Sequence, residues 1–72
     1  MKTETFYTKG KQDCNAAIEV TVHDKGAVAS AERDHITRLQ LRKVLQKDYP
    51  DYIWSIEANT TFGYWQAYGR IA

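Results

Sequence analysis

The sequence predicts an α+β fold of two layers, in which one helix packs on an antiparallel or mixed sheet of about four strands. Three observations lead to this fold class. The segment AAIEVTVH alternates apolar and polar residues with the period of two that is typical of a half-buried strand. The segment 31–47 tolerates helix at every position, and two strand-like segments rich in aromatic residues follow it. The predicted order of elements is therefore β-β-α-β-β.

Two strands are predicted before the helix. Residues 4–9, ETFYTK, are β-prone and predict a short strand at an edge of the sheet. In AAIEVTVH, Ile18, Val20 and Val22 form the apolar side, and the turn residues 24–26 follow. The next segment, AVAS, is consistent either with a short return strand or with the approach to a helix.

The predicted helix extends over residues 31–47, with Ser30 as its N-cap and Pro50 after its end. The half of the helical wheel predicted to face the sheet consists of Ile36, Thr37, Gln40, Leu41, Val44 and Leu45. The opposite half carries a polar stripe of His35, Arg38, Arg42 and Gln46, interrupted by Leu39. Such a stripe usually contacts only water, but it is also a candidate contact surface for phosphates or for an acidic partner.

The last two predicted strands, YIWSIEA and FGYWQAYGRI, are joined by the turn NTT. Alternate residues of a strand point to opposite faces of its sheet. The side predicted to lie under the helix holds Gly63, Trp65, Ala67, Gly69 and Ile71, and Trp54, Ile56, Ile18 and Val20 complete that core. The far side is then left with Phe62, Tyr64, Tyr68 and Arg70, extended by Tyr7 if that ring points the same way.

Composition excludes several classes of protein. The 72 residues predict a single domain over 1–72, and Cys14, the only cysteine, predicts no disulfide and a reducing, cytoplasmic location. No signal peptide or membrane span is expected. The histidines His23 and His35 have no metal-ligand or catalytic spacing, so we expect no metal, no cofactor and no enzymatic activity. Glu19 and Glu57, which alternation allows on adjacent strands, are expected to be solvated surface groups.

The leading functional hypothesis is a small regulatory protein that binds a protein partner through the aromatic far face of its sheet. The rival is a nucleic-acid binder that uses this face with Lys9 and Arg70, or the helix stripe with Arg38 and Arg42. A net charge of +1 argues against binding driven by bulk charge. A third hypothesis is an inhibitor of a host defence complex. A weak homodimer is also expected, through the far faces or the N-terminal edge strand.

The order of segments resembles the DinI-like family of small damage-inducible proteins over residues 18–69. The residues that carry the resemblance are IEVTV, the turn YPD, and the strand segments WSIEA and GYWQAYG. The resemblance implies a β-α-β-β core and a small regulatory binder, from a phage or mobile element. Family members bind the RecA filament largely through an acidic C-terminal helix, which this sequence lacks, so no functional residue is carried over.

Overall fold

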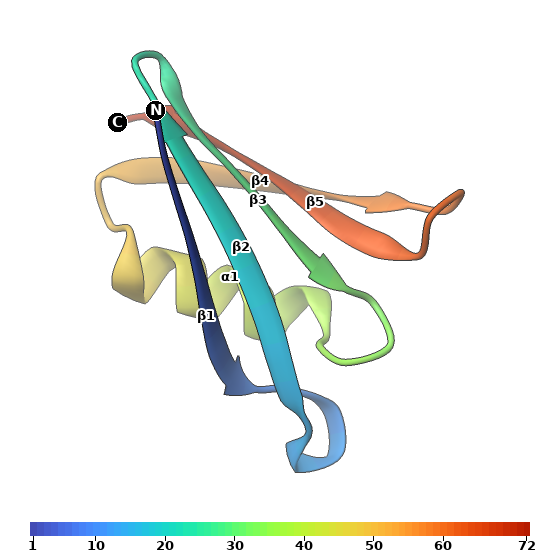
Figure 1. The fold of residues 1–72 in the computed structure, drawn as a ribbon. Coiled ribbons are helices and arrows are strands. Elements are labelled where there is room, and N and C mark those ends of the chain that lie inside the picture. The colour runs from blue at the N-terminus through green and yellow to red at the C-terminus, as the bar shows by residue number, and fades with distance from the viewer.

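A computed structural model describes residues 1–72 as five strands and one helix (Figure 1). All five strands belong to one antiparallel sheet of order β1-β2-β3-β5-β4. The strands are β1 (Lys2–Lys9), β2 (Asn15–His23), β3 (Gly26–Glu32), β4 (Tyr52–Asn59) and β5 (Tyr64–Ile71). The helix α1 (Arg38–Asp48) lies behind the sheet in the view of Figure 1, and a 3-10 turn, η1 (Lys11–Asp13), links β1 to β2. The α+β class and its two layers are thus confirmed.

The sheet has five strands, not about four, because the segment AVAS, left open between a short return strand and the approach to the helix, belongs to a strand, β3, which also includes the first two predicted helical residues, Ala31 and Glu32. Ser30, predicted to cap the helix, instead lies within β3, opposite Glu19 of β2 and Gln66 of β5. The segment GAVASAE places alanines on one face with a period of two, at 27, 29 and 31. Alanine favours helix by local propensity, but the central position between β2 and β5 overrides that preference. The element order is therefore β-β-β-α-β-β.

The helix begins seven residues later than predicted, at Arg38, with Thr37 as its N-cap. The hydroxyl of Thr37 accepts a 3.1 Å hydrogen bond from the Gln40 amide, and the Gln40 side chain accepts a 2.9 Å bond from the Thr37 amide. This reciprocal pair is a capping box. The helix ends at Asp48, two residues before Pro50, close to the predicted end. No helix in the structure has the length and apolar character of a membrane span.

The hydrophobic core lies between α1 and the sheet face beneath it. It consists of Ala16, Ile18, Val20, Ala27, Ala29, Ala31, Ile36, Leu41, Leu45, Trp54, Ile56 and Ala67. The predicted helix side of the sheet is confirmed for the buried residues Ile18, Val20, Trp54, Ile56, Ala67 and Gly69 and for the partly buried Trp65. It was wrong at Gly63, which lies in the β4–β5 turn, and at Ile71, which is 60% exposed. Trp54 of β4 packs over its cross-strand neighbour Gly69, where a Cβ atom would lie only 2.9 Å from the ring. The small residue at position 69 accommodates this ring, and the alanines of β3 leave room for the helix.

Candidate functional site

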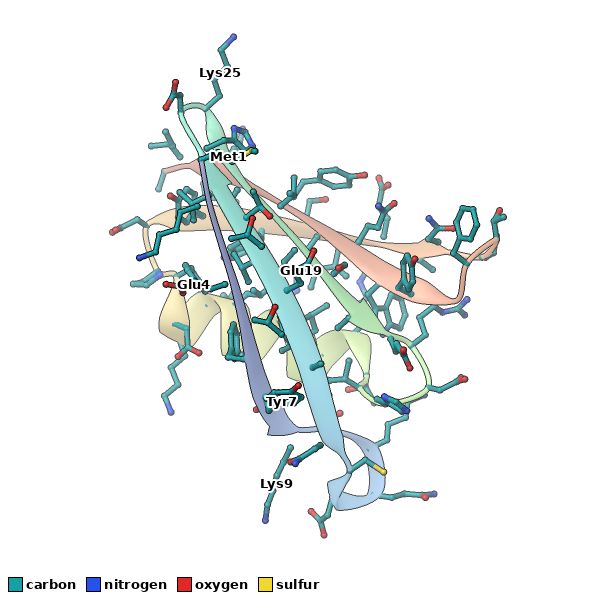
Figure 2. All side chains as sticks on the ribbon, viewed as in Figure 1. Met1, Glu4, Tyr7, Lys9, Glu19 and Lys25 are labelled. Carbon is teal, nitrogen blue, oxygen red and sulfur yellow. The ribbon has the colours of Figure 1, made fainter.

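The sheet face opposite α1, which we call the open face, is covered by no other segment of the chain (Figure 1). Its side chains are those that alternate with the core residues along each strand. Phe6, for example, packs against the core, so its neighbours in β1 point to the open face. Figure 2 shows Glu19 midway along β2, with Tyr7 and Lys9 toward the end of β1 farthest from Met1. The open face is therefore a surface that the fold leaves available for a partner.

The strand register arranges the open-face residues in rows across the sheet. The middle row is polar on every strand and consists of Thr5, Glu19, Ser30, Gln66 and Glu57. The row on one side of it is more apolar and consists of Thr3, Thr21, Val28, Tyr68 and Ser55. On the other side, Tyr64 lies opposite Glu32 and Asn59. A polar band therefore separates Tyr64, at the start of β5, from Tyr68, farther along the same strand.

Two shallow hollows lie on this polar band. The larger has a volume of about 380 Å³ and is lined by Thr5, Ala17, Glu19, Ser30, Ala31, Glu32, Tyr64 and Gln66. The smaller, of about 130 Å³, is lined by Glu19, Thr21, Val28, Ala29, Ser30 and Gln66. Three polar residues, Glu19, Ser30 and Gln66, belong to both hollows. The centre of the open face is thus concave and offers carboxylate, hydroxyl and amide groups to a partner.

The predicted aromatic residues all lie outside the core. Tyr64 and Tyr68 are 36% and 46% exposed, and Phe62 and Tyr7 are 69% and 68% exposed. Phe62 lies in the β4–β5 turn, not in the strand to which it was assigned, and its ring stacks on Tyr64 with centroids 6.3 Å apart. Tyr7 is three strand positions from Tyr64, about 14 Å across the sheet, so it does not contact the stacked pair. We use the name aromatic cluster for the stacked pair Phe62 and Tyr64 together with Tyr68, which lies on the same strand as Tyr64 but on the other side of the polar band.

The two basic residues predicted on the far face, Lys9 and Arg70, both lie on the open face, but only Arg70 lies near an aromatic ring, in the row next to Tyr68. Arg70 lies in the row of Gly26 and Ile53, toward one end of the sheet. Lys9 lies opposite Asn15, at the other end. The carboxylates Glu19, Glu32 and Glu57 stand between them. The middle of the open face is consequently acidic, which sequence alone did not predict because it depends on strand order.

The polar stripe predicted on the helix is shorter than expected. Arg38, Leu39, Arg42 and Gln46 belong to α1, with Leu39 61% exposed. His35 instead lies in the loop before the helix, where its Nδ1 atom is 3.3 Å from Oε2 of Glu32. The helix holds four basic residues and one acidic residue, a net charge of +3. Basic charge is therefore concentrated on the layer opposite the open face.

With one exception, the remaining residues that could act in catalysis or bind a metal lie apart from one another. Glu19 and Glu57, considered as neighbours on adjacent strands, are separated by β3 and β5 and lie about 14 Å apart. Cys14 is a free, exposed thiol. No three His, Cys, Asp or Glu side chains are grouped so that they could hold a metal ion. The Glu32–His35 contact is the one acid–histidine pair, and both side chains are largely exposed.

Comparisons with protein-family models, with curated proteins and with solved structures found no match to this chain. The resemblance to the DinI-like family therefore stays a prediction.

Proposed function

We propose that this protein is a small, non-catalytic interaction module that binds a protein partner through the open face of its sheet. The observation that carries the proposal is the aromatic cluster, which remains exposed beside a concave polar band. Aromatic side chains combine a large apolar area with few rotatable bonds, and they are enriched at protein interfaces. Tyr64 and Tyr68 also keep hydroxyl groups at their outer ends, which suits a surface that is wet before binding.

The charges of the open face favour a protein partner over nucleic acid. A nucleic-acid strand that stacked on Tyr64 would bring its phosphates near Glu32, the cross-strand neighbour of Tyr64, and near the carboxylates of the adjacent polar band. The two cations of this face, Lys9 and Arg70, lie at opposite ends of the sheet and do not offset that repulsion. A partner segment with basic or hydrogen-bonding groups between apolar anchors fits the same surface without such a penalty.

The second candidate function is nucleic-acid binding through α1. The observation that favours it is the net charge of +3 on this helix, with Arg38 exposed near its start. This candidate uses the layer opposite the open face, so the two functions depend on different residues. Two roles would act through the proposed protein binding. One is regulation of a phage or mobile element, and the other is inhibition of a host defence complex.

The experiment compares two double variants as baits in a host lysate. Tyr64→Ala/Tyr68→Ala removes rings from the open face, and Arg38→Ala/Arg42→Ala is the matched control on the other layer. We expect the first variant to retain its circular dichroism spectrum and to lose recovery of the wild-type partner about tenfold or more, since interface tyrosines are frequent hot spots. The control should recover the partner at the wild-type level.

A second experiment tests the rival function, nucleic-acid binding through α1. Labelled single-stranded and duplex oligonucleotides are titrated with the wild type and with Arg38→Ala/Arg42→Ala at two salt concentrations. Micromolar binding that weakens steeply with salt and is lost in the arginine variant would identify α1 as a nucleic-acid site. Unfolding of Tyr64→Ala/Tyr68→Ala would show instead that these rings act in the core.

A further inference from the structure

The two edge strands of the sheet differ in how they discourage pairing with another chain. Natural edge strands are commonly blocked by charged residues, above all lysine. β1 carries Lys2, Glu4 and Lys9 among its eight residues. β4, at the other edge, has the sequence YIWSIEAN and carries a single charge, at Glu57. The less charged edge is therefore β4, which has no lysine.

The backbone of β4 has an outer side whose hydrogen-bonding groups can pair with a further strand. Ala72 donates its amide to the carbonyl of Asp51 at 3.1 Å, which identifies Asp51 as a residue bonded toward β5. Bonded and non-bonded residues alternate along an antiparallel strand, so Ile53, Ser55 and Glu57 are also directed toward β5. The amides and carbonyls of Trp54 and Ile56 are consequently directed outward, where no strand of this chain lies.

We propose that β4 pairs antiparallel with β4 of a second copy of this chain, about a two-fold axis at Ser55. Ser55 then lies opposite Ser55 of the second copy, and Trp54 lies opposite Ile56. Each Trp54–Ile56 pair forms two backbone hydrogen bonds, using the outward groups of both strands. The axis is perpendicular to the sheet, so both helices stay on one side and both open faces stay on the other.

Charge complementarity favours the β4–β4 register that is centred on Ser55. Arg70 is the cross-strand neighbour of Ile53 on the open face. In the proposed pairing, Glu57 of the second copy lies directly beyond Ile53, two strand spacings or about 10 Å from Arg70. An extended arginine and a glutamate bridge that separation over the Ile53 side chain. Within the monomer Arg70 and Glu57 are exposed, and neither belongs to an ion pair. Symmetry provides this contact twice.

The two neighbouring registers lack this complementarity. Pairing Trp54 with itself sets Glu57 against Asp51 of the second copy, and like charges directly opposite one another destabilise a sheet. Pairing Ile56 with itself places Asn59 beyond Ile53 and leaves Arg70 without a carboxylate. The register centred on Ser55 is therefore favoured. It differs from the dimers considered from sequence, which used the β1 edge or the far faces, and it does not depend on the proposed partner of the open face.

The first test combines sedimentation with cross-linking in a Cys14→Ser background. Residues opposite one another at the non-hydrogen-bonded positions of an antiparallel pair have Cα atoms about 4.5 Å apart, which is within the range of a disulfide. Ser55→Cys should therefore cross-link to itself under mild oxidation. Ile53→Cys is the matched control on the same face, because its two copies would be four residues or about 13 Å out of register. Wild-type protein should change from 8.3 kDa to twice that mass as its concentration rises.

The second test exchanges the charges. Glu57→Arg should weaken the dimer about tenfold, because it replaces two attractions with two repulsions. The double variant Glu57→Arg/Arg70→Glu should restore association to within about threefold of the wild type. A wild-type mass that stays at 8.3 kDa at every concentration up to millimolar would overturn the proposal. Equal cross-linking of Ser55→Cys and Ile53→Cys would overturn the register.

Discussion

The hydroxyl of Tyr49 donates a 2.8 Å hydrogen bond to Oε2 of Glu4 and so connects the end of α1 to the edge strand β1. The Tyr49 ring also approaches Phe6 of β1 and Trp54 of β4, with centroid distances of 6.4 and 6.3 Å. This residue therefore contacts both edge strands from beneath the sheet. The hydrogen bond lowers the pKa of Glu4, helped by nearby Lys2. Burial, followed by the contact with Glu4, raises the pKa of Tyr49 to about 12.

The loss of stability caused by Tyr49→Phe should be greatest at pH values above the titration of Glu4 and below that of Tyr49. The folded pKa of Tyr49 lies above its ordinary value of 10.0, so its contribution is complete below pH 10 and is lost as pH rises toward about 12. The folded pKa of Glu4 lies below 4.5, so its contribution is complete above that value and is lost as the pH falls. Urea denaturation of both proteins across this pH range measures the difference.

The control for this prediction is Tyr52→Phe, since the hydroxyl of Tyr52 makes no hydrogen bond within the protein. Its stability should follow the wild type at every pH. A difference between wild type and Tyr49→Phe that is independent of pH would contradict the assignment of the hydrogen bond to Glu4.

Gly10→Ala should destabilise the protein by about 1–3 kcal/mol through overpacking. A Cβ atom at Gly10 would meet the backbone carbonyl of His35, which accepts a 2.8 Å hydrogen bond from the Lys11 amide. Gln40 also holds this segment, by a 3.2 Å bond to the Gly10 carbonyl. Gly63→Ala is the comparison: it has open space around it but a φ of +72°, so the cost there is about 1 kcal/mol and comes from backbone strain alone.

Thr37→Ala should cost about 1 kcal/mol, because it removes the capping box of α1. Ser30→Ala should leave helix content unchanged, because Ser30 lies in β3. Chemical denaturation and the far-ultraviolet circular dichroism of the two variants provide the comparison. A larger loss of helix signal in Ser30→Ala would mean that the helix begins where the sequence pattern first indicated.

Leu45→Ala should cost about 2–5 kcal/mol, as expected for a leucine that is fully buried between α1 and the sheet. Leu39→Ala, on the same helix but 61% exposed, should change stability by no more than about 0.5 kcal/mol. Thermal melts of the two variants separate the inner and outer faces of α1. Similar costs for both leucines would indicate that Leu39 is covered, for instance by a second protein copy.

Sequence patterns predicted the fold best in strands where every second residue is apolar and buried. Trp54, Ile56 and Ala67 were placed correctly under the helix because a strand with one buried face repeats every two residues. β3 was left undecided because its alanines favour helix by local propensity, and only the strands on either side of it decide in favour of a strand. The capping box of Thr37 and Gln40 was legible in the sequence as T-x-x-Q, but Ser30 offered a competing N-cap.

The candidate site was predicted only in part, because alternation along a strand gives the face of each residue but not the order of the strands. Alternation alone was enough to place Tyr64 and Tyr68 on the far face. The acidic centre of that face requires the strand order, since Glu19 and Glu57 come from strands that are not neighbours. The contact of His35 with Glu32 likewise depends on where β3 ends. Sequence reasoning missed the strand order and the position at which β3 ends, on which these two arrangements depend.

The separation of charge between α1 and the open face gives this nearly neutral protein an electric dipole. The helix has a net charge of +3, whereas Glu19, Glu32 and Glu57 outnumber Lys9 and Arg70 on the open face. At about 0.15 M salt, screening confines this asymmetry to roughly 8 Å from the surface, so it acts only when a partner is almost in contact. In dilute salt it reaches farther and rotates the molecule during approach, presenting α1 to anionic surfaces and the aromatic cluster to cationic ones.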